Sequence, residues 1–219
     1  MLMPLPFDLL IFDLDGTLID YRKDIAGSIN RMLAALNLPP KEESLIATYV
    51  GNGVANLIRH SLGEGYEKLS GRALKIFKHD YDAHLLDYTR LYPDVSNVLE
   101  KLGAVPKAVI TNKPLSFSEK ILKGLSVRGH FNFVLGGDMA FPKKPAPESV
   151  LHLMKEARQS RKDKVLIVGD SCLDIQTGKN AGIKTCAVTY GFGARHELEA
   201  AKPDYVIDKF EGILEIIDK

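Results

Sequence analysis

The stretch LLIFDLDGT at residues 9–17 places four consecutive apolar residues directly before two aspartates and a glycine. Near-continuous apolar runs of this length are typical of parallel strands that are buried on both faces. Asp13 and Asp15, spaced by two at the end of the strand, can point toward a common site, and Gly16 lets the chain turn sharply away. A buried strand with an ordinary Asp-Gly turn has the same sequence, so other segments must decide between the two interpretations.

Further short apolar runs along the chain resemble the first one, and helical patterns separate the later runs. The expected strands after the first are residues 107–110, 133–136, 165–168, 185–188 and 204–207. The expected helices are residues 116–122, 148–157, 173–181 and 211–217, of which the first would begin with a capping box formed by Ser116 and Glu119. This alternation predicts an α/β fold with a doubly wound parallel sheet and right-handed crossovers.

The stretch from about residue 20 to residue 88 interrupts the alternation, because it contains apolar stripes at helical spacing and no convincing strand. One stripe starts at Ile25 and Ile29, and others follow the Pro39-Pro40 break. We therefore expect a catalytic core with an inserted all-helical cap domain. The expected ranges are 1–18 and 89–219 for the core, 19–88 for the cap, and 17–20 and 88–93 for its hinges.

The composition is that of an ordinary globular protein, with 45% hydrophobic residues and a formal net charge of +1. This charge gives no electrostatic reason to expect nucleic acid or an anionic membrane as a partner. No segment approaches ~18 uninterrupted apolar residues, and the apolar N-terminus lacks the basic region of a signal peptide. Because Cys172 and Cys186 form no C-x-x-C pair, we expect a reduced, cytoplasmic setting. The oligomeric state is left open between a monomer and a homodimer.

Polar residues also follow the second predicted strand and stand in a proline-flanked loop. Ligands of doubly wound sheets bind at the carboxyl ends of the strands. Thr111 and Asn112 lie at such an end, just before a helix N-terminus that suits an anion. Lys144, in Lys-Pro-Ala-Pro, would be a fixed point charge able to bind phosphate and to hold Asp13 ionised.

The run at residues 165–168 ends in Gly-Asp-Ser-Cys-Leu-Asp, which brings Asp170 to the same edge of the sheet. Its carboxylate is the type of oxygen ligand that Mg²⁺ requires, and Asp174 lies one helical turn further on. Each of these segments alone could be a helix cap or a turn. Together they supply a nucleophile, an acid/base, a phosphate clamp and a metal ligand, which are the parts needed for phosphoryl transfer.

Four segments resemble, in order, the four motifs of the haloacid dehalogenase superfamily, on its phosphatase branch with a helical cap. They are FDLDGTL at Asp13, VITNKP at Thr111, KKPAP at Lys144 and VGDSCLDI at Asp170. The resemblance covers nearly the whole chain. Within the superfamily, the likeness is to phosphoglycolate phosphatases, and it rests on VGNGVANLI from Val50, TNKP, VTYGFG from Val188 and PDYVIDKFEGIL from Pro203.

The resemblance implies a phosphoric monoester hydrolase that forms an aspartyl-phosphate on Asp13. Asp15 would protonate the leaving oxygen and then activate water. The residues implied to hold the phosphoryl oxygens are Thr111, Asn112 and Lys144. The implied cofactor is Mg²⁺, with ligands from the Asp13 carboxylate, the Asp15 backbone carbonyl and Asp170, supported by Asp174. The superfamily often has Ser or Thr where this chain has Tyr21, and Ala-Gly where it has Thr177-Gly178.

The motifs leave the substrate open, although a small phosphorylated metabolite is expected and phosphoglycolate is favoured. A β-phosphoglucomutase-like phosphotransferase, a phosphatase of sugar phosphates, nucleotides or pyrophosphate, and a non-catalytic binding module are the alternatives. The cap loop Gly51-Asn52-Gly53 is expected to face the core and contact the substrate. Arg59 and Lys23 could meet a substrate carboxylate, but solvated surface positions are favoured for both.

Overall fold

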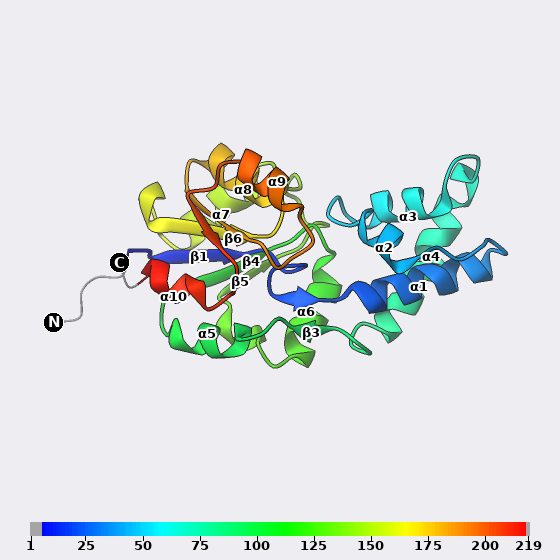
Figure 1. The fold of residues 1–219 in the computed structure, drawn as a ribbon, viewed down its shortest axis with the longest axis horizontal. Helices are drawn as coiled ribbons and strands as arrows, with labels where there is room; N and C mark the ends of the chain where they lie inside the picture. The colour runs from blue at the N-terminus through cyan, green and yellow to red at the C-terminus, as the bar shows by residue number, and fades with distance from the viewer. Residues whose placement is uncertain (1–5, 218–219) are drawn as a thin grey trace.

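The computed structural model describes residues 6–217, in which a six-stranded parallel sheet forms the centre of the molecule (Figure 1). The strand order is β5-β4-β1-β6-β7-β8, so β1 lies between β4 and β6. The bounds are Leu9–Phe12 for β1, Lys107–Ile110 for β4, Phe133–Leu135 for β5, Val165–Gly169 for β6, Lys184–Val188 for β7 and Tyr205–Ile207 for β8. Each predicted strand is present within one residue of its expected ends.

Helices cover both faces of the sheet, which explains why the strands are apolar throughout (Figure 1). Leu10 and Phe12 of β1 belong to one hydrophobic cluster, which includes residues of α5, α6 and α10, whereas Leu9 and Ile11 belong to a second cluster with α7. The helices of this part are α5 Val95–Lys101, α6 Leu115–Gly124, α7 Glu148–Glu156, α8 Cys172–Ala181, α9 Arg195–Ala200 and α10 Gly212–Ile217. The doubly wound α/β fold is thus confirmed.

The predicted capping box at Ser116 and Glu119 is wrong, because α6 begins one residue earlier, at Leu115, and Ser116 lies inside it. Pro114 precedes the helix without a side chain that could cap it. The cap comes instead from a distant residue, Asp138, whose Oδ1 accepts a hydrogen bond from the backbone N–H of Leu115 at 2.8 Å. Local sequence spacing cannot reveal a cap of this kind.

Four helices between β2 and β3 form a separate helical layer beyond the carboxyl edge of the sheet (Figure 1). They are α1 Arg22–Ala35, α2 Glu43–Ala47, α3 Val54–Leu62 and α4 Ser70–Ala83, with a short 3₁₀ turn at Glu67–Leu69. Two further 3₁₀ turns, Arg128–His130 and Lys162–Lys164, belong to the part of the chain that contains the sheet. Helix α1 packs against α2, α3 and α4. The apolar stripes bury Ile29, Leu33 and Phe77 between these helices.

Where the helical layer joins the sheet, two short strands pair with each other. Strand β2 (Ile19–Asp20) runs antiparallel to β3 (Arg90–Leu91), with Ile19 opposite Leu91. These strands fall within the expected hinge segments, 17–20 and 88–93. The sequence did not indicate them, because two residues are too few to show a strand periodicity.

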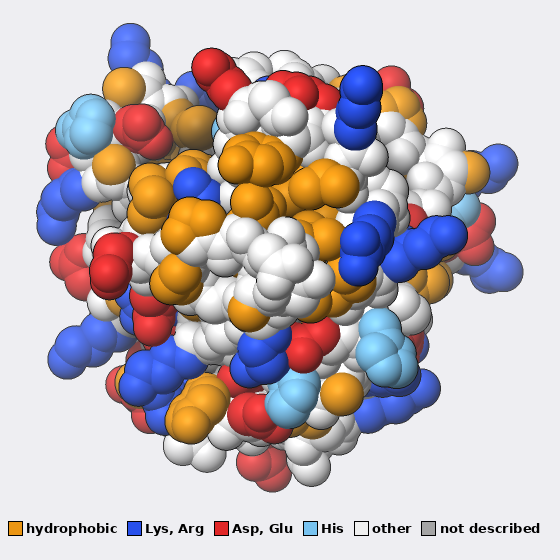
Figure 2. All heavy atoms as spheres, turned by 90° about the vertical axis from the view of Figure 1, so that its right-hand side faces the viewer, with side chains coloured by type: hydrophobic (Ala, Val, Ile, Leu, Met, Phe, Trp, Pro, Cys, Tyr) orange, Lys and Arg blue, Asp and Glu red, His pale blue; other side chains and the backbone are white. Residues whose placement is uncertain are grey.

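Figure 2 shows the outer end of the α1–α4 layer, where a central group of hydrophobic side chains is surrounded by basic and acidic ones. Charges of both signs are interspersed on this face, so it presents no continuous basic field of the kind that attracts nucleic acid. No helix within residues 6–217 is both long enough and apolar enough to span a membrane.

The buried Asp24 side chain of α1 is hydrogen-bonded to the segment just before β3, where the chain returns from the helical layer to the sheet. Its carboxylate accepts hydrogen bonds from the backbone N–H groups of Tyr88 and Thr89 and from the Thr89 hydroxyl, at 2.7–3.0 Å. Replacing Asp24 with Ala would leave these donors without their acceptor. We expect Asp24→Ala to lower the free energy of unfolding by about 2–4 kcal/mol, measured by urea denaturation.

The matched control is Asp82→Ala, because Asp82 is an exposed residue of α4 whose partner is the exposed Lys120. It should change the unfolding free energy by less than about 1 kcal/mol. Equal losses in the two variants would contradict the role given to Asp24.

Candidate active site

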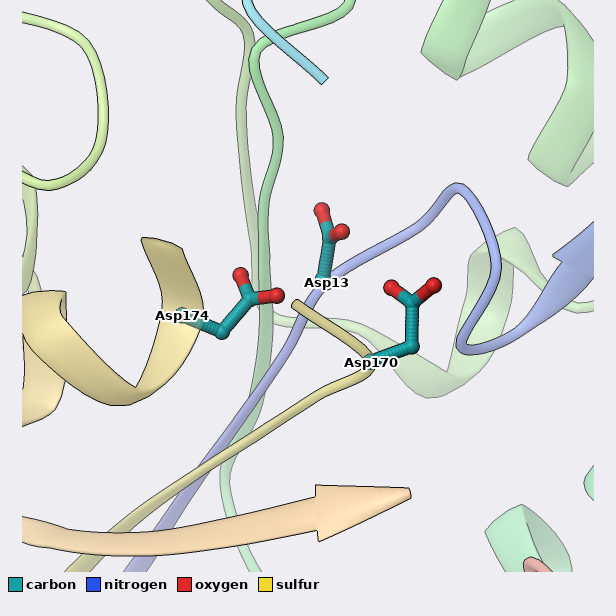
Figure 3. Close-up of side chains that lie close together, drawn as sticks. All are labelled: Asp13, Asp170 and Asp174. Atoms are coloured by element: carbon teal, nitrogen blue, oxygen red, sulfur yellow. The ribbon is translucent and has the colours of Figure 1, made fainter. Parts of the chain in front are cut away.

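Three buried aspartates from separate elements meet at the carboxyl edge of the sheet (Figure 3). Asp13 directly follows β1, Asp170 directly follows β6, and Asp174 lies in the first turn of α8. One carboxylate oxygen from each lies within 4.8 Å of the other two. The register between β1 and β6 produces this proximity, because Phe12 pairs with Val168 and the N–H of Asp13 donates to the Val168 carbonyl.

The turn after β1 depends on Gly16, whose φ of +82° is in the region that favours glycine. A Cβ atom at this position would lie 2.2 Å from Oδ2 of Asp170. The Asp170 carboxylate is further oriented by hydrogen bonds from the Thr17 hydroxyl at 3.3 Å and from the Phe192 N–H at 2.7 Å. The glycine therefore allows two strand ends to approach each other closely.

Lys144 lies between two of the aspartates and is itself buried. Its Nζ atom is 2.7 Å from Oδ1 of Asp13 and 2.6 Å from Oδ1 of Asp174. Burial lowers the pKa of Lys144, but the charges of Asp13 and Asp174 outweigh it and leave the pKa raised, so the ammonium stays charged. Asp174 is fixed in turn through its other oxygen, which accepts hydrogen bonds from the N–H and hydroxyl of Ser171 in a capping box.

The pKa values of two aspartates are raised. For Asp13, burial raises the pKa, Lys144 opposes it, and the charges of Asp174, Asp170 and Asp15 raise it further, to well above its ordinary value. For Asp170, burial and Asp174 raise the pKa to about 7, although the Phe192 N–H and Lys144 act in the opposite direction. The cluster thus carries more negative charge than one ammonium can balance.

A divalent cation fits this donor set. The three carboxylates supply hard oxygen ligands within a small volume, and their mutual repulsion and burial would be relieved by a positive charge between them. Asp174 is the least available of the three, because Lys144 and Ser171 already engage both of its oxygens. Its part toward a metal ion would therefore be to orient the neighbouring groups.

Thr111 and Asn112 extend from the end of β4 into the same site, and their side chains have different partners. The Thr111 hydroxyl accepts a hydrogen bond from the N–H of Lys113 at 3.2 Å, which leaves its own proton available to an anion. The Asn112 amide accepts from the N–H of Lys144 at 3.1 Å and donates to the Gly51 carbonyl at 2.8 Å. Both functional groups of that amide are therefore engaged, so Asn112 links the core to the cap loop.

A cavity of about 500 Å³ lies between the sheet edge and the helical layer. It is lined by nine of the ten site residues predicted from the sequence, the exception being Asp174. These are Asp13, Asp15, Gly51, Asn52, Gly53, Thr111, Asn112, Lys144 and Asp170. The expectation that the glycine loop faces the core is met by its lining of the cavity and by the Asn112 hydrogen bond.

The helical layer contributes mainly apolar and aromatic side chains to the cavity, among them Val54, Leu57 and Phe77. Arg59 and Lys23 do not line it. Arg59 is exposed and donates to Asn56, and Lys23 is exposed with its Nζ 5.7 Å from the ring of Tyr88. The expectation that Arg59 and Lys23 occupy surface positions is thus confirmed.

Lys113 is a site residue that the sequence reasoning did not single out. Its side chain is buried, with Nζ 2.9 Å from Oδ1 of Asp15 and 3.1 Å from the hydroxyl of Tyr81. Burial lowers its pKa, but Asp15 and Tyr81 more than compensate and the pKa is raised. The TNKP segment contains this lysine, but its resemblance to the superfamily motif implies roles only for Thr111 and Asn112.

The comparisons with known proteins agree with this geometry. The family model of haloacid dehalogenase-like hydrolases matches residues 10–188. The chain is 36% identical over 214 residues to the phosphoglycolate phosphatase of Pectobacterium atrosepticum, covering 95% of this chain and 91% of that protein. It is 34% identical to the phosphoglycolate phosphatase of Aquifex aeolicus, covering 95% and 96%.

Among solved structures, a predicted phosphoglycolate phosphatase from Haemophilus somnus matches with a TM-score of 0.91 and 34% identity, covering 98% of this chain and 99% of that one. The chain therefore belongs to the haloacid dehalogenase-like hydrolase family. Over nearly its whole length it is similar to proteins named as phosphoglycolate phosphatases.

The raised pKa of Asp170 predicts how the stability of the metal-free protein depends on pH. The folded-state pKa of about 7 lies above the ordinary value of 3.8, so the folded protein binds this proton more tightly than the unfolded chain does. The stabilising contribution is complete below pH 3.8 and is lost as pH rises through 7. We expect the unfolding free energy of chelator-treated protein to fall over this range less steeply in Asp170→Asn than in the wild type.

Urea unfolding at a series of pH values, in the presence of chelator, measures this difference. Added Mg²⁺ should reduce the decline in the wild type, because the cation stabilises the ionised carboxylates. Parallel pH profiles for the wild type and the variant would show that Asp170 is not the group responsible.

Proposed function

We propose that this protein is a Mg²⁺-dependent phosphatase that hydrolyses a small phosphomonoester, with phosphoglycolate favoured, through an aspartyl-phosphate on Asp13. The observation that carries the proposal is the buried cluster of Asp13, Asp170 and Asp174 around Lys144, which faces a cavity of suitable size. Family membership and the named phosphoglycolate phosphatases among its relatives support the reaction class.

In the first step, a carboxylate oxygen of Asp13 attacks the phosphorus atom and the bond from phosphorus to the ester oxygen breaks. Lys144 favours the ionised form of Asp13 and, with the Thr111 hydroxyl, can donate to the phosphoryl oxygens. Asn112 can contribute its backbone N–H, because its side-chain amide is engaged elsewhere. Asp15, which also lines the cavity, gives its proton to the departing alkoxide.

In the second step, water attacks the phosphorus of the aspartyl-phosphate while Asp15 accepts a proton from it. The Asp13 carboxylate is the leaving group, and inorganic phosphate is released. The implied Mg²⁺ would be held by the Asp13 and Asp170 carboxylates and the Asp15 backbone carbonyl. When bound, it would neutralise the charge that Asp13 shares with the incoming phosphate.

Residues 19–88 would act as a cap over this reaction. The cap loop is hydrogen-bonded to the core from Asn112 to Gly51, and the apolar walls from α3 and α4 would limit the access of bulk solvent to the cavity. The connections through β2 and β3 are the places where the cap would open to admit substrate. The volume of about 500 Å³ is in the usual range of small-molecule sites and leaves room for a small ester.

The class of reaction is tested by phosphate release from phosphoglycolate, hexose phosphates, nucleoside monophosphates and pyrophosphate, each with Mg²⁺ and with chelator. We expect chelator-sensitive release, with phosphoglycolate the best substrate. Asp13→Asn should lower kcat roughly 10³-fold or more, because the nucleophile is lost. Full metal-dependent turnover by this variant would refute the aspartyl-phosphate mechanism.

The role of Asp15 as a proton donor is tested through the leaving group. Asp15→Asn should lower kcat for an alkyl phosphate by roughly 10²–10⁴-fold. The loss should be smaller with p-nitrophenyl phosphate, since a phenolate departs without needing a proton. Steady-state kinetics of both esters measure the contrast, and an equal loss for the two would contradict the acid role.

A further inference from the structure

The cavity contains one cation that the steps above do not use. Among residues 6–217, the basic side chains that line it are Lys113 and Lys144. Lys144 is held between Asp13 and Asp174, where the phosphoryl group would be transferred. Lys113 reaches instead toward the cap, because its Nζ lies beside the hydroxyl of Tyr81 on α4.

The ammonium of Lys113 has hydrogen-bonding capacity left over. It carries three N–H donors, and its oxygen partners among the described residues are Asp15 at 2.9 Å and the Tyr81 hydroxyl at 3.1 Å. Its other contacts are with aromatic rings, because Nζ lies 3.8 Å from the ring centroid of Tyr21 and 5.2 Å from that of Tyr81. A further acceptor in the cavity would complete the coordination of a buried charge.

Tyr21 gives a second, independent sign of a missing ligand. Its side chain lines the cavity and is 1% exposed, yet its hydroxyl has no hydrogen-bond partner within residues 6–217. Burial, followed by the charge of Asp15, raises the pKa of Tyr21, so the hydroxyl remains a donor. A tyrosine with an unpaired buried hydroxyl, whose ring lies against the Lys113 ammonium, is suited to an anionic acceptor.

We propose that Lys113, set between Tyr21 and Tyr81, is the specificity-determining residue that binds a carboxylate on the carbon next to the ester oxygen of the substrate. The inference rests on the proposed phosphatase function. Asp15 faces the leaving oxygen in that mechanism, and the Nζ atom of Lys113 lies 2.9 Å from its Oδ1. A carboxylate one carbon beyond the leaving oxygen would therefore be held beside the ammonium. The described residues of the range 19–88 that line the cavity include no basic side chain.

The experiment compares two esters of nearly equal size in the full-length protein with Mg²⁺. Phosphoglycolate carries the carboxylate, and 2-hydroxyethyl phosphate has a neutral hydroxymethyl group in its place. The measured quantity is the ratio of their kcat/KM values. In Lys113→Met, which keeps an unbranched side chain without charge, this ratio should fall roughly 10- to 100-fold.

Two further variants distinguish the loss of carboxylate binding from a purely structural effect of the substitution. Tyr81→Phe keeps the buried ring and removes the hydroxyl next to Lys113, so it should lower the same ratio by a smaller factor. Lys120→Met is the matched control, because Lys120 is an exposed lysine on α6 that pairs with Asp82. It should leave the ratio unchanged.

The outcomes separate this inference from the proposed function. If the wild type releases phosphate from neither ester, the proposed function fails. If the wild type is active and Lys113→Met slows both esters equally, Lys113 only positions Asp15 and the carboxylate assignment is overturned. Pyrophosphate serves as a third substrate. If Lys113→Met lowers kcat/KM for pyrophosphate alone, the assignment is also overturned, because the group that Lys113 recognises would then be a second phosphate.

Discussion

The cluster of like charges at the carboxyl edge of the sheet is the feature on which the surrounding strands and loops depend. Asp13, Asp170 and Asp174 are buried close together, and a single ammonium from Lys144 lies among them. Burial and mutual repulsion make such a cluster unfavourable by itself. The paired strands β1 and β6, packed by helices on both faces, hold the carboxylates in position. A cation between the carboxylates would relieve this repulsion, and the proposed function adds a phosphoryl group to the same place.

The links between the core and the helical layer start from residues near this cluster. The Asn112 amide connects the backbone of Lys144 with the cap loop at Gly51. Lys113, the next residue, connects Asp15 with Tyr81 on α4. The contacts of the helical layer with Asp15 and with the Lys144 backbone therefore run through adjacent residues of the β4–α6 loop. This coupling explains how one short segment could influence both substrate choice and chemistry.

The sheet and the polar strand ends could be predicted because each depends on a local pattern. The apolar run at residues 9–12 predicts a buried strand, and the polar residues after it mark its end. Features that depend on distant partners could not be predicted in this way. The cap of α6 comes from Asp138, and the burial of Lys113 depends on Tyr81 of another element. The functional roles of the site residues stay predictions.

The central claim is that phosphate passes through a covalent bond to Asp13. The most direct measurement is to mix the enzyme with phosphoglycolate and Mg²⁺, quench with acid within one turnover, and map the phosphorylated peptide by mass spectrometry. The account predicts one added phosphoryl group on the peptide that contains Asp13, and none in Asp13→Asn. Rapid phosphate release with no phosphorylated enzyme, or a phosphoryl group on a different residue, would contradict it.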